Sequence, residues 1–191
     1  MDKIGLKAYG KINLALDVVR KREDGYHEVR MIMQTVKMYD YIQIKKTKEK
    51  GIKIVTNLSF LPTNENNLVY KAAKLLMDEF GIDTGIEIKL DKFIPVAAGM
   101  AGGSTDCAAA LVGAAKLFGL DVSRKELMEL GVKLGADVPY CVLRGTALSE
   151  GIGEELTSLP PMPDCLILIA KPPIGVSTKF VYEHLDAAGL S

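Results

Sequence analysis

The sequence lacks an excess of charge of either sign, paired cysteines and any long hydrophobic run. Lys plus Arg and Asp plus Glu number 24 each among the 191 residues, so no overall field attracts nucleic acid or an anionic membrane. The three cysteines, Cys107, Cys141 and Cys165, have no CxxC spacing, which argues for a reducing compartment without disulfides or zinc. No apolar run approaches the ~20 residues that span a bilayer, and the first residues contain no long apolar stretch with a cleavage site, so we expect no cleavable leader. We expect a cytoplasmic protein that binds neither nucleic acid nor membrane.

The residues that are present suit a globular protein, with 48% hydrophobic and 25% charged. Residues 11–19 alternate as in a strand, and an Asp24-Gly25 turn leads to a second extended stretch. Residues 41–56 predict a hairpin with a lysine-rich tip. Helical spacing follows from Leu68 to Phe80, with Asn66 or Asn67 as the cap and Gly81 as the stop.

The second half continues this irregular alternation of elements. We expect a strand over 85–96, a helix over 104–118 that stops at Gly119, and a helix that opens at the capping box of Ser123 and Glu126. Residues 146–156 and 166–171 predict strands, and residues 177–188 predict a helix. This order favours an α+β fold over a doubly wound parallel sheet. Prolines at 159–164 predict a boundary between domains 1–158 and 159–191.

A glycine-rich loop, PVAAGMAGGST, occupies residues 95–105 and opens an alanine-rich helix. The first N–H groups of a helix are unpaired and favour anions, and Gly99, Gly102 and Gly103 permit a close backbone approach to a phosphate. Ser104 and Thr105 add hydroxyl donors. The loop is no P-loop, because Ser104 stands where that motif has lysine, and it lacks GxGxxG spacing. The alternative is a tight turn with small residues for close packing.

Several polar residues outside the loop have two readings each. Asp137 either caps a helix or faces a cleft. Lys11 shares a strand face with Asn13. Either both side chains reach one polar cleft, or Lys11 is exposed to solvent on an open face of the sheet. Tyr26 and His27 follow the turn and either stack on a ligand or pack under a hairpin.

Three segments together resemble the GHMP kinases. They are PVAAGMAGGSTDCAAAL, KINLALDVVRKREDGYHEV and GADVPYCVLRGTALSEGIGEEL, and the resemblance runs from about Lys7 to Tyr182. It implies a ribosomal-protein-like α+β N-terminal domain followed by the start of a ferredoxin-like C-terminal domain. It also implies an ATP- and Mg²⁺-dependent kinase of isoprenoid (terpenoid) biosynthesis. The implied acceptor is the 2-hydroxyl of a cytidine-diphosphate-linked methylerythritol.

The resemblance also implies roles for residues of this sequence. Lys11 and Asp137 would be catalytic, and no metal ligand is indicated. The substrate contacts would be Asn13, Tyr26, His27, Thr178 and Tyr182. The ATP contacts would be Pro95, Val96, Ala97, Ala98, Gly99, Met100, Ala101, Gly102, Gly103, Ser104 and Thr105 of the loop, with Asn66 and Lys92. Asn66 caps a helix and Lys92 is solvated on the alternative reading. The loop departs from the GLGGGSS of many relatives.

Relatives continue through the rest of a second domain, so we expect residues 1–191 alone to turn over weakly or not at all. One alternative is another small-alcohol kinase of the homoserine or mevalonate type, against which DGYH and Tyr182 speak. A second alternative is a non-catalytic phosphate- or RNA-binding module of the same fold. Zero net charge and the pairing of Lys11 with Asp137 speak against that module.

Overall fold

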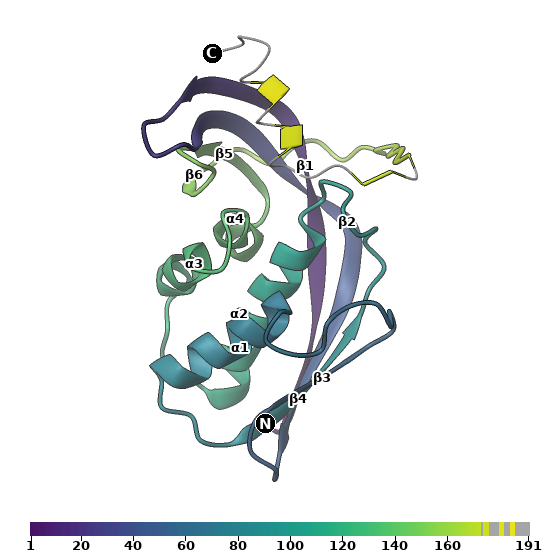
Figure 1. Cartoon of the computed structure of the whole chain (residues 1–191), viewed down its shortest axis with the longest axis vertical. Helices are drawn as coiled ribbons and strands as arrows, with labels where there is room; N and C mark the ends of the chain where they lie inside the picture. Colours follow the sequence, from purple (N-terminus) through teal and green to yellow (C-terminus); the bar gives the residue numbers. More distant parts are fainter. Residues whose placement is uncertain (173, 176–179, 182–183, 186–191) are drawn as a thin grey trace.

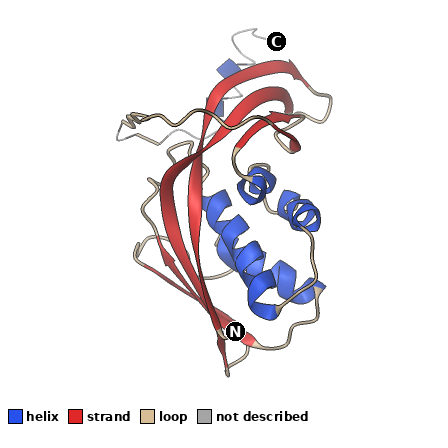
Figure 2. Ribbon diagram, turned by 180° about the vertical axis from the view of Figure 1, so that it is seen from behind, coloured by secondary structure: helices blue, strands red, loops and turns tan. Residues whose placement is uncertain are grey.

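The structure, a computed structural model, describes residues 1–172, 174–175, 180–181 and 184–185. The four helices between residues 68 and 143 lie against one face of a long, curved sheet (Figure 1, Figure 2). The elements in chain order are β1 (Lys3–Lys21), β2 (His27–Thr47), β3 (Ile52–Thr56), α1 (Leu68–Glu79), β4 (Gly85–Asp91), α2 (Gly102–Phe118), α3 (Arg124–Val132), α4 (Val138–Leu143), β5 (Thr146–Glu150) and β6 (Glu155–Ser158).

The sheet is built around β2, the longest strand. β1 pairs with β2 antiparallel from Lys3 opposite Lys45 to Lys21 opposite His27, across the expected turn at Asp24 and Gly25. The remaining order is β3-β4-β2-β5-β6, in which β4, β5 and β6 join antiparallel and β3 lies parallel to β4. The prediction of two extended stretches around this turn is confirmed.

The hairpin predicted over residues 41–56 is wrong. β2 and β3 are not neighbours, because β4 lies between them and pairs with both. Ile52, for example, lies opposite Ile86 of β4 in parallel register. Strand patterns in a sequence fix which residues are extended, but the partner of a strand depends on residues more than 30 positions away here.

Bulges break the alternation that the sequence predicts for β1. The register shifts between Asn13 and Ala15 leave Leu14 as an extra residue without a partner on β2. Leu14 and Leu16 are 45% and 48% exposed, whereas Lys11, on the supposed polar face, is buried. The bulged strand therefore turns a lysine inward and two leucines outward.

The core lies between the sheet and α1 and α2. Ile42 and Ile44 of β2 and Leu111 of α2 are fully buried. α2 presents alanines to its neighbours, and Cβ-less Gly113 lets it approach the side chains of Leu6 and Ile44. Small residues here allow close packing of a helix on a sheet.

The predicted helix ends are largely confirmed. Asn67 caps α1 by accepting a hydrogen bond from the N–H of Val69 (2.9 Å), and Ser123 and Glu126 form the capping box of α3. Gly119 ends α2 in a left-handed conformation. α2 begins at Gly102, two residues before the predicted start, because both glycines adopt helical geometry.

The chain after β6 differs from its predicted pattern. Residues 166–171 form no strand, since no strand of the described residues pairs with them, and Leu166 and Leu168 are almost fully exposed. The predicted helix over 177–188 is observed only where the structure describes it, at residues 180–181 and 184–185, which are helical. The domain boundary at 159 stays a prediction.

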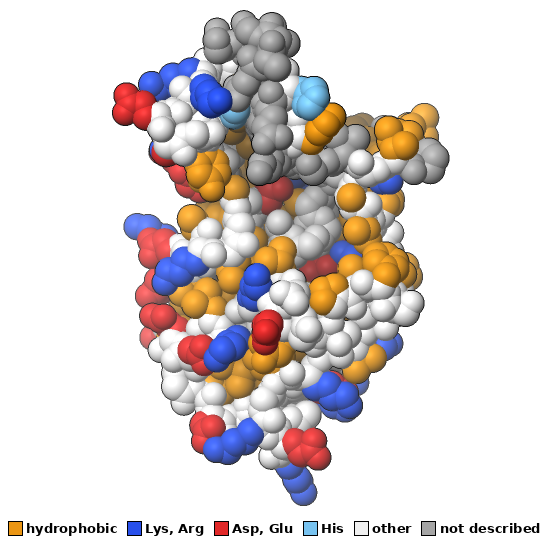
Figure 3. Space-filling view, viewed as in Figure 1, with side chains coloured by type: hydrophobic (Ala, Val, Ile, Leu, Met, Phe, Trp, Pro, Cys, Tyr) orange, Lys and Arg blue, Asp and Glu red, His pale blue; other side chains and the backbone are white. Residues whose placement is uncertain are grey.

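The surface shows no concentration of one charge on the face drawn in Figure 3, where basic and acidic side chains are interspersed. Among the described residues, no helix has the length and apolar character needed to cross a membrane.

Candidate active site

A cavity of about 1190 Å³ lies where the glycine-rich loop, β1, the start of α1 and Asp137 meet. It brings together most of the residues that the sequence singled out. Tyr26 and His27 line it from the β1–β2 turn, and Asn66 lines it from the segment before α1. The loop contributes every residue from Pro95 to Ser104. Thr178 and Tyr182 lie outside the described residues.

The loop and the first turn of α2 present backbone donors to the cavity. Ala101, the N-cap, has a left-handed backbone (φ 54°) and no side chain that accepts a hydrogen bond. Thr105 is the first residue whose N–H is bonded, to the Ala101 carbonyl (2.8 Å). Within the described residues the N–H groups of Gly102, Gly103 and Ser104 have no acceptor. Three adjacent donors at a helix N-terminus form a site for an anion.

Only one of the three loop glycines has a positive φ angle, although glycine is the residue that adopts such angles most readily. Gly99 is left-handed (φ 71°), but Ala97 and Ala101 are the other two residues with this backbone. Gly102 is helical, and a Cβ there would lie 3.2 Å from Lys92 Nζ and 3.3 Å from Ile94. Gly102 therefore serves close packing, so the packing alternative holds at this position.

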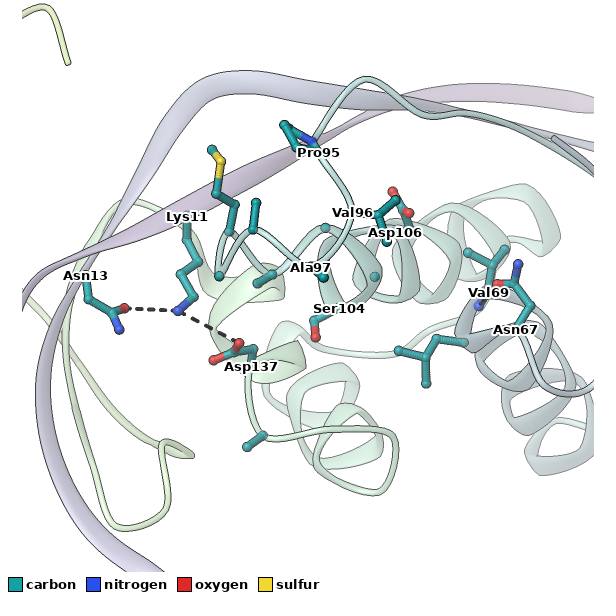
Figure 4. Close-up of a pocket in the computed structure, with 18 of the residues that line it drawn as sticks. Lys11, Asn13, Asn67, Val69, Pro95, Val96, Ala97, Ser104, Asp106 and Asp137 are labelled. Carbon is teal, nitrogen blue, oxygen red and sulfur yellow. Dashed lines mark hydrogen bonds and ion pairs between the residues drawn. The ribbon is translucent and has the colours of Figure 1, made fainter. Parts of the chain in front are cut away.

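The side chains of two residues of this segment are buried: Thr105, which does not line the cavity, and Met100, which lines it only in part. The Thr105 hydroxyl donates to the Tyr9 carbonyl (2.7 Å) and is buried, so the predicted phosphate contact of this side chain is not supported. Met100 is buried in a small cluster with Val36 and Ile94, where it fills the core. The Ser104 side chain faces the cavity (Figure 4).

Lys11, Asn13 and Asp137 meet on the opposite wall (Figure 4). Lys11 Nζ donates to Asn13 Oδ1 (3.0 Å) and lies 3.9 Å from Asp137 Oδ2. The Lys11 side chain is 8% exposed and that of Asp137 is 32% exposed. The Lys11 N–H donates to the Met100 carbonyl (3.1 Å), which ties β1 to the loop. An ammonium and a carboxylate thus share the cavity with the start of α2.

The geometry decides between the two readings of Asp137 and of Lys11. Asp137 occupies the N-cap position of α4, but its side chain makes no cap hydrogen bond and projects into the cavity. Lys11 is buried, so the solvated reading is wrong. Asn67 is the cap of α1, as one of the two predictions for the asparagines has it. Its side chain also donates to the Pro62 carbonyl (2.7 Å).

Lys92 belongs to a buried charge cluster that the sequence did not reveal. Its ammonium contacts Asp40 of β2 and donates to Asp106 Oδ2 (2.6 Å), so the solvated alternative for Lys92 is wrong. Asp40 Oδ1 also accepts from the N–H groups of Phe93 and Ile94. The cluster joins β2, the end of β4 and α2 directly beneath the loop.

Asp106 is the member of this cluster whose carboxyl group is buried with one oxygen unpartnered in the described part of the chain. It is 2% exposed, and its Oδ1 has no hydrogen-bond partner within the described residues. Burial, with the Asp40 charge adding and the Lys92 charge opposing, raises the pKa of Asp106 to about 8. The one sequence feature that could have indicated this cluster is a single carboxylate within an apolar stretch. Asp106 in α2 and Asp40 in β2 both stand in such a stretch.

Two of the three cysteines, Cys107 and Cys141, are buried. Burial raises the pKa of the Cys107 thiol to about 12 and also raises the pKa of the Cys141 thiol, so both stay protonated and unreactive. Cys165 is exposed. Among the residues that the structure describes, no three His, Cys, Asp or Glu side chains cluster as metal ligands would.

Comparisons with known proteins agree with this site. Residues 67–145 match the GHMP kinases N terminal domain. A 4-diphosphocytidyl-2-C-methyl-D-erythritol kinase of Lachnoclostridium phytofermentans is 68% identical over 97% of this chain and 64% of its own length. One of Lachnospira eligens is 63% identical over 97% and 65%. The chain thus spans a little less than two thirds of these curated relatives.

Solved structures give the same fold. A crystal structure of 4-(cytidine 5'-diphospho)-2C-methyl-D-erythritol kinase has a TM-score of 0.72 and 35% identity, over 82% of this chain and 55% of that one. A homoserine kinase from Cytophaga hutchinsonii has a TM-score of 0.68 at 20% identity, over 96% and 60%, which supports the fold alone. The α+β prediction is confirmed, and residues 67–145 carry a GHMP kinases N terminal domain.

Proposed function

We propose that the protein is an ATP-dependent kinase that phosphorylates the 2-hydroxyl of a cytidine-diphosphate-linked methylerythritol. The observation that carries the proposal is the Lys11–Asp137 pair, 3.9 Å apart, in one cavity with the unpaired N–H groups at the start of α2. The names of the relatives at 68% and 63% identity support the substrate.

The triphosphate of ATP would bind at the loop. Hydrogen bonds to a charged acceptor contribute ~1.5–3 kcal/mol each, more than the ~0.3–1 kcal/mol of the helix dipole at an exposed end. The donors are the backbone groups of Gly102, Gly103 and Ser104, with the Ser104 hydroxyl beside them. Because these groups are fixed by the helix, little reorganisation accompanies binding.

The alcohol would lie between Asp137 and the γ-phosphate. Its oxygen forms a bond to the γ-phosphorus, the bond from that phosphorus to the bridging oxygen breaks, and ADP leaves. The hydroxyl proton passes to the Asp137 carboxylate, which general base catalysis requires to be ionised. The Lys11 ammonium offsets negative charge on the transferring group.

Magnesium is the metal that the fold family implies, and the donor set fits it. Mg²⁺ binds oxygen ligands, commonly one or two carboxylates with the substrate phosphates, and supplies charge neutralisation on the phosphate oxygens. The Asp137 carboxylate and the Ser104 hydroxyl are oxygen donors that line the cavity.

Tyr26 and His27 are proposed to contact the cytosine. Tyr26 is 61% exposed beside the cavity, and its N–H donates to Asp24 Oδ1 (3.1 Å), which holds the turn. The reading in which Tyr26 packs under the hairpin does not fit this exposure. An exposed ring at the edge of a cavity provides a face on which a base can stack.

The test is ADP release with the cytidine-linked alcohol, homoserine and mevalonate as separate substrates. It is run on residues 1–191 and on a chimera that adds the remaining third of the Lachnoclostridium phytofermentans relative. We expect the chimera to consume the cytidine-linked alcohol selectively and residues 1–191 to be weak or inactive. Selective use of homoserine or mevalonate by the chimera would contradict the proposed substrate. The absence of turnover with all three alcohols would contradict the proposed kinase activity.

A further inference from the structure

A second hollow of about 430 Å³ lies outside the cavity described above. Its lining shares no residue with that cavity. β1 contributes two residues, β2 contributes four, and one residue follows α4. The lining consists of Lys7, Tyr9, Thr35, Val36, Lys37, Tyr39 and Arg144.

The lining is basic, although the chain carries no net charge. Lys7, Lys37 and Arg144 supply three positive charges, and no carboxylate lines the hollow. None of the three forms an ion pair within the described part of the chain. Three uncompensated cations around one concave surface raise the local concentration of anions.

Aromatic rings, rather than carboxylates, hold two of these cations. Lys7 Nζ lies 4.4 Å from the centre of the Tyr39 ring, and the Arg144 guanidinium lies 5.4 Å from the centre of the Tyr9 ring. The two rings meet edge to face with centres 5.4 Å apart. Cation–π contacts orient a cation without neutralising it, so the charges stay available to a ligand.

Arg144 is further fixed through its backbone and its side chain. One guanidinium nitrogen, Nη2, donates to the Lys7 carbonyl (3.2 Å), which leaves the other N–H groups of the fork for an acceptor. Its backbone has φ 66° and ψ −178°, a region that is essentially restricted to glycine. Backbone strain of this kind gathers at ligand sites, and a glycine at this position would relieve it.

We propose that this hollow binds a multiply charged phosphate group, of the diphosphate type, at a site separate from the catalytic cavity. The planar fork of arginine matches phosphate oxygens in pairs, and the two lysines add point charges. A diphosphate carries enough negative charge to engage all three cations. The fixed rings and the strained arginine hold the donors in place before the ligand arrives.

The test is a titration with inorganic pyrophosphate followed by NMR. The glycine-rich loop is expected to bind the same probe, and NMR reports on the two sites separately. Backbone amides of residues 35–39 and the Arg144 Nε–H report on the hollow, and amides of residues 99–104 report on the loop. We expect saturable shifts in the first set. In Lys7→Gln/Lys37→Gln the affinity from that set falls at least tenfold, while the shifts in the loop are unchanged. The control pair Lys48→Gln/Lys133→Gln removes the same charge from exposed positions and leaves both sets unchanged.

Arg144→Gly separates a ligand role from a packing role. We expect this variant to lose the saturable shifts of residues 35–39 and to melt at a higher temperature than the wild type, since glycine tolerates the backbone. The absence of shifts in the wild-type hollow would overturn the proposal. Equal affinity in the Lys7→Gln/Lys37→Gln pair and the control pair would overturn it too. So would an Arg144→Gly variant that melts lower and binds pyrophosphate as the wild type does.

Discussion

At the scale of single residues, the positions that carry chemistry are polar groups held in unusual surroundings. Lys11 is buried at a bulged strand, and its neighbours Asn13 and Asp137 fix the direction of its ammonium. Strand spacing predicts that Lys11 and Asn13 share one face, and the resemblance adds Asp137 to them. The charges of Asp40 and Asp106 escaped prediction, since an isolated carboxylate in an apolar stretch does not reveal its buried partner.

Lys11→Met in the chimera tests the role of the ammonium. The methionine keeps the buried stem and removes the charge, so we expect turnover to fall about 10²-fold, the lower end of the loss when one group that stabilises the transition state is removed. The free energy of unfolding is expected to change little, because the methionine fills the buried space and the partners that lose the ammonium, Asn13 and Asp137, are accessible to solvent. Steady-state kinetics and urea titration check both. Lys71→Met, at an exposed position of α1, is the control, and unchanged turnover in Lys11→Met would refute the role.

Asp106→Asn tests the buried carboxyl. Its pKa is about 8 in the folded protein and about 3.9 in the unfolded protein, so the folded state binds one more proton between these pH values. This group's contribution to stability is complete below about pH 4 and is lost as the pH rises to about 8. Asparagine does not titrate. The stability of the wild type relative to Asp106→Asn is therefore expected to fall by about 1.4 kcal/mol per pH unit within this window.

Urea titrations at pH 6, 7, 8 and 9 measure this difference. Asp121→Asn removes a carboxylate from an exposed position and serves as the control for loss of charge. A constant difference between the wild type and Asp106→Asn from pH 6 to pH 8 would show that Asp106 does not retain its proton in the folded state.

At the scale of elements, the loop and α2 act as one unit. The buried cluster beneath the loop fixes Lys92 between β2 and α2, and the Met100 carbonyl accepts a hydrogen bond from β1. Helix positions could be predicted from spacing and caps, since both signals are local. The pairing of β3 with β4 could not, because it depends on a partner distant in the sequence.

Ala101 tests whether the loop geometry matters for the anion. Its left-handed backbone is costly for a β-branched side chain, so we expect Ala101→Val to weaken the binding of a non-hydrolysable ATP analogue at least tenfold and to lower stability. Calorimetric titration measures the affinity. Ser123→Ala removes the cap of α3 and costs about 1 kcal/mol of stability, but should bind the analogue as tightly as the wild type. Equal affinities in Ala101→Val and Ser123→Ala would contradict the role of the loop.

At the scale of the whole molecule, the described chain is a sheet with one helical layer and an extended segment after β6. The α+β class could be predicted from the irregular order of helix and strand patterns along the chain. This prediction does not require knowing which strands pair. The strand predicted over 166–171 is not observed, because a short run of apolar residues forms a strand only when a neighbouring strand pairs with its backbone.

Limited digestion with thermolysin tests the boundary predicted at 159. Residues 166–169 are apolar, Leu166 and Leu168 are almost fully exposed, and the backbone there is in neither helix nor strand. Such segments are preferred sites of nicking. We expect the first cuts between residues 163 and 172 and a resistant product that contains β1 to β6, identified by mass spectrometry. First cuts within β2 or α1 would place the boundary elsewhere.

The central claim is that Asp137 takes the proton of the attacking alcohol. Asp137→Asn in the chimera tests it most directly, since asparagine keeps the shape and removes the base. We predict that the variant binds the ATP analogue within about threefold of the unsubstituted chimera, while turnover of the cytidine-linked methylerythritol falls at least 10²-fold, the lower range for loss of a general base. Turnover at the unsubstituted rate would contradict the account.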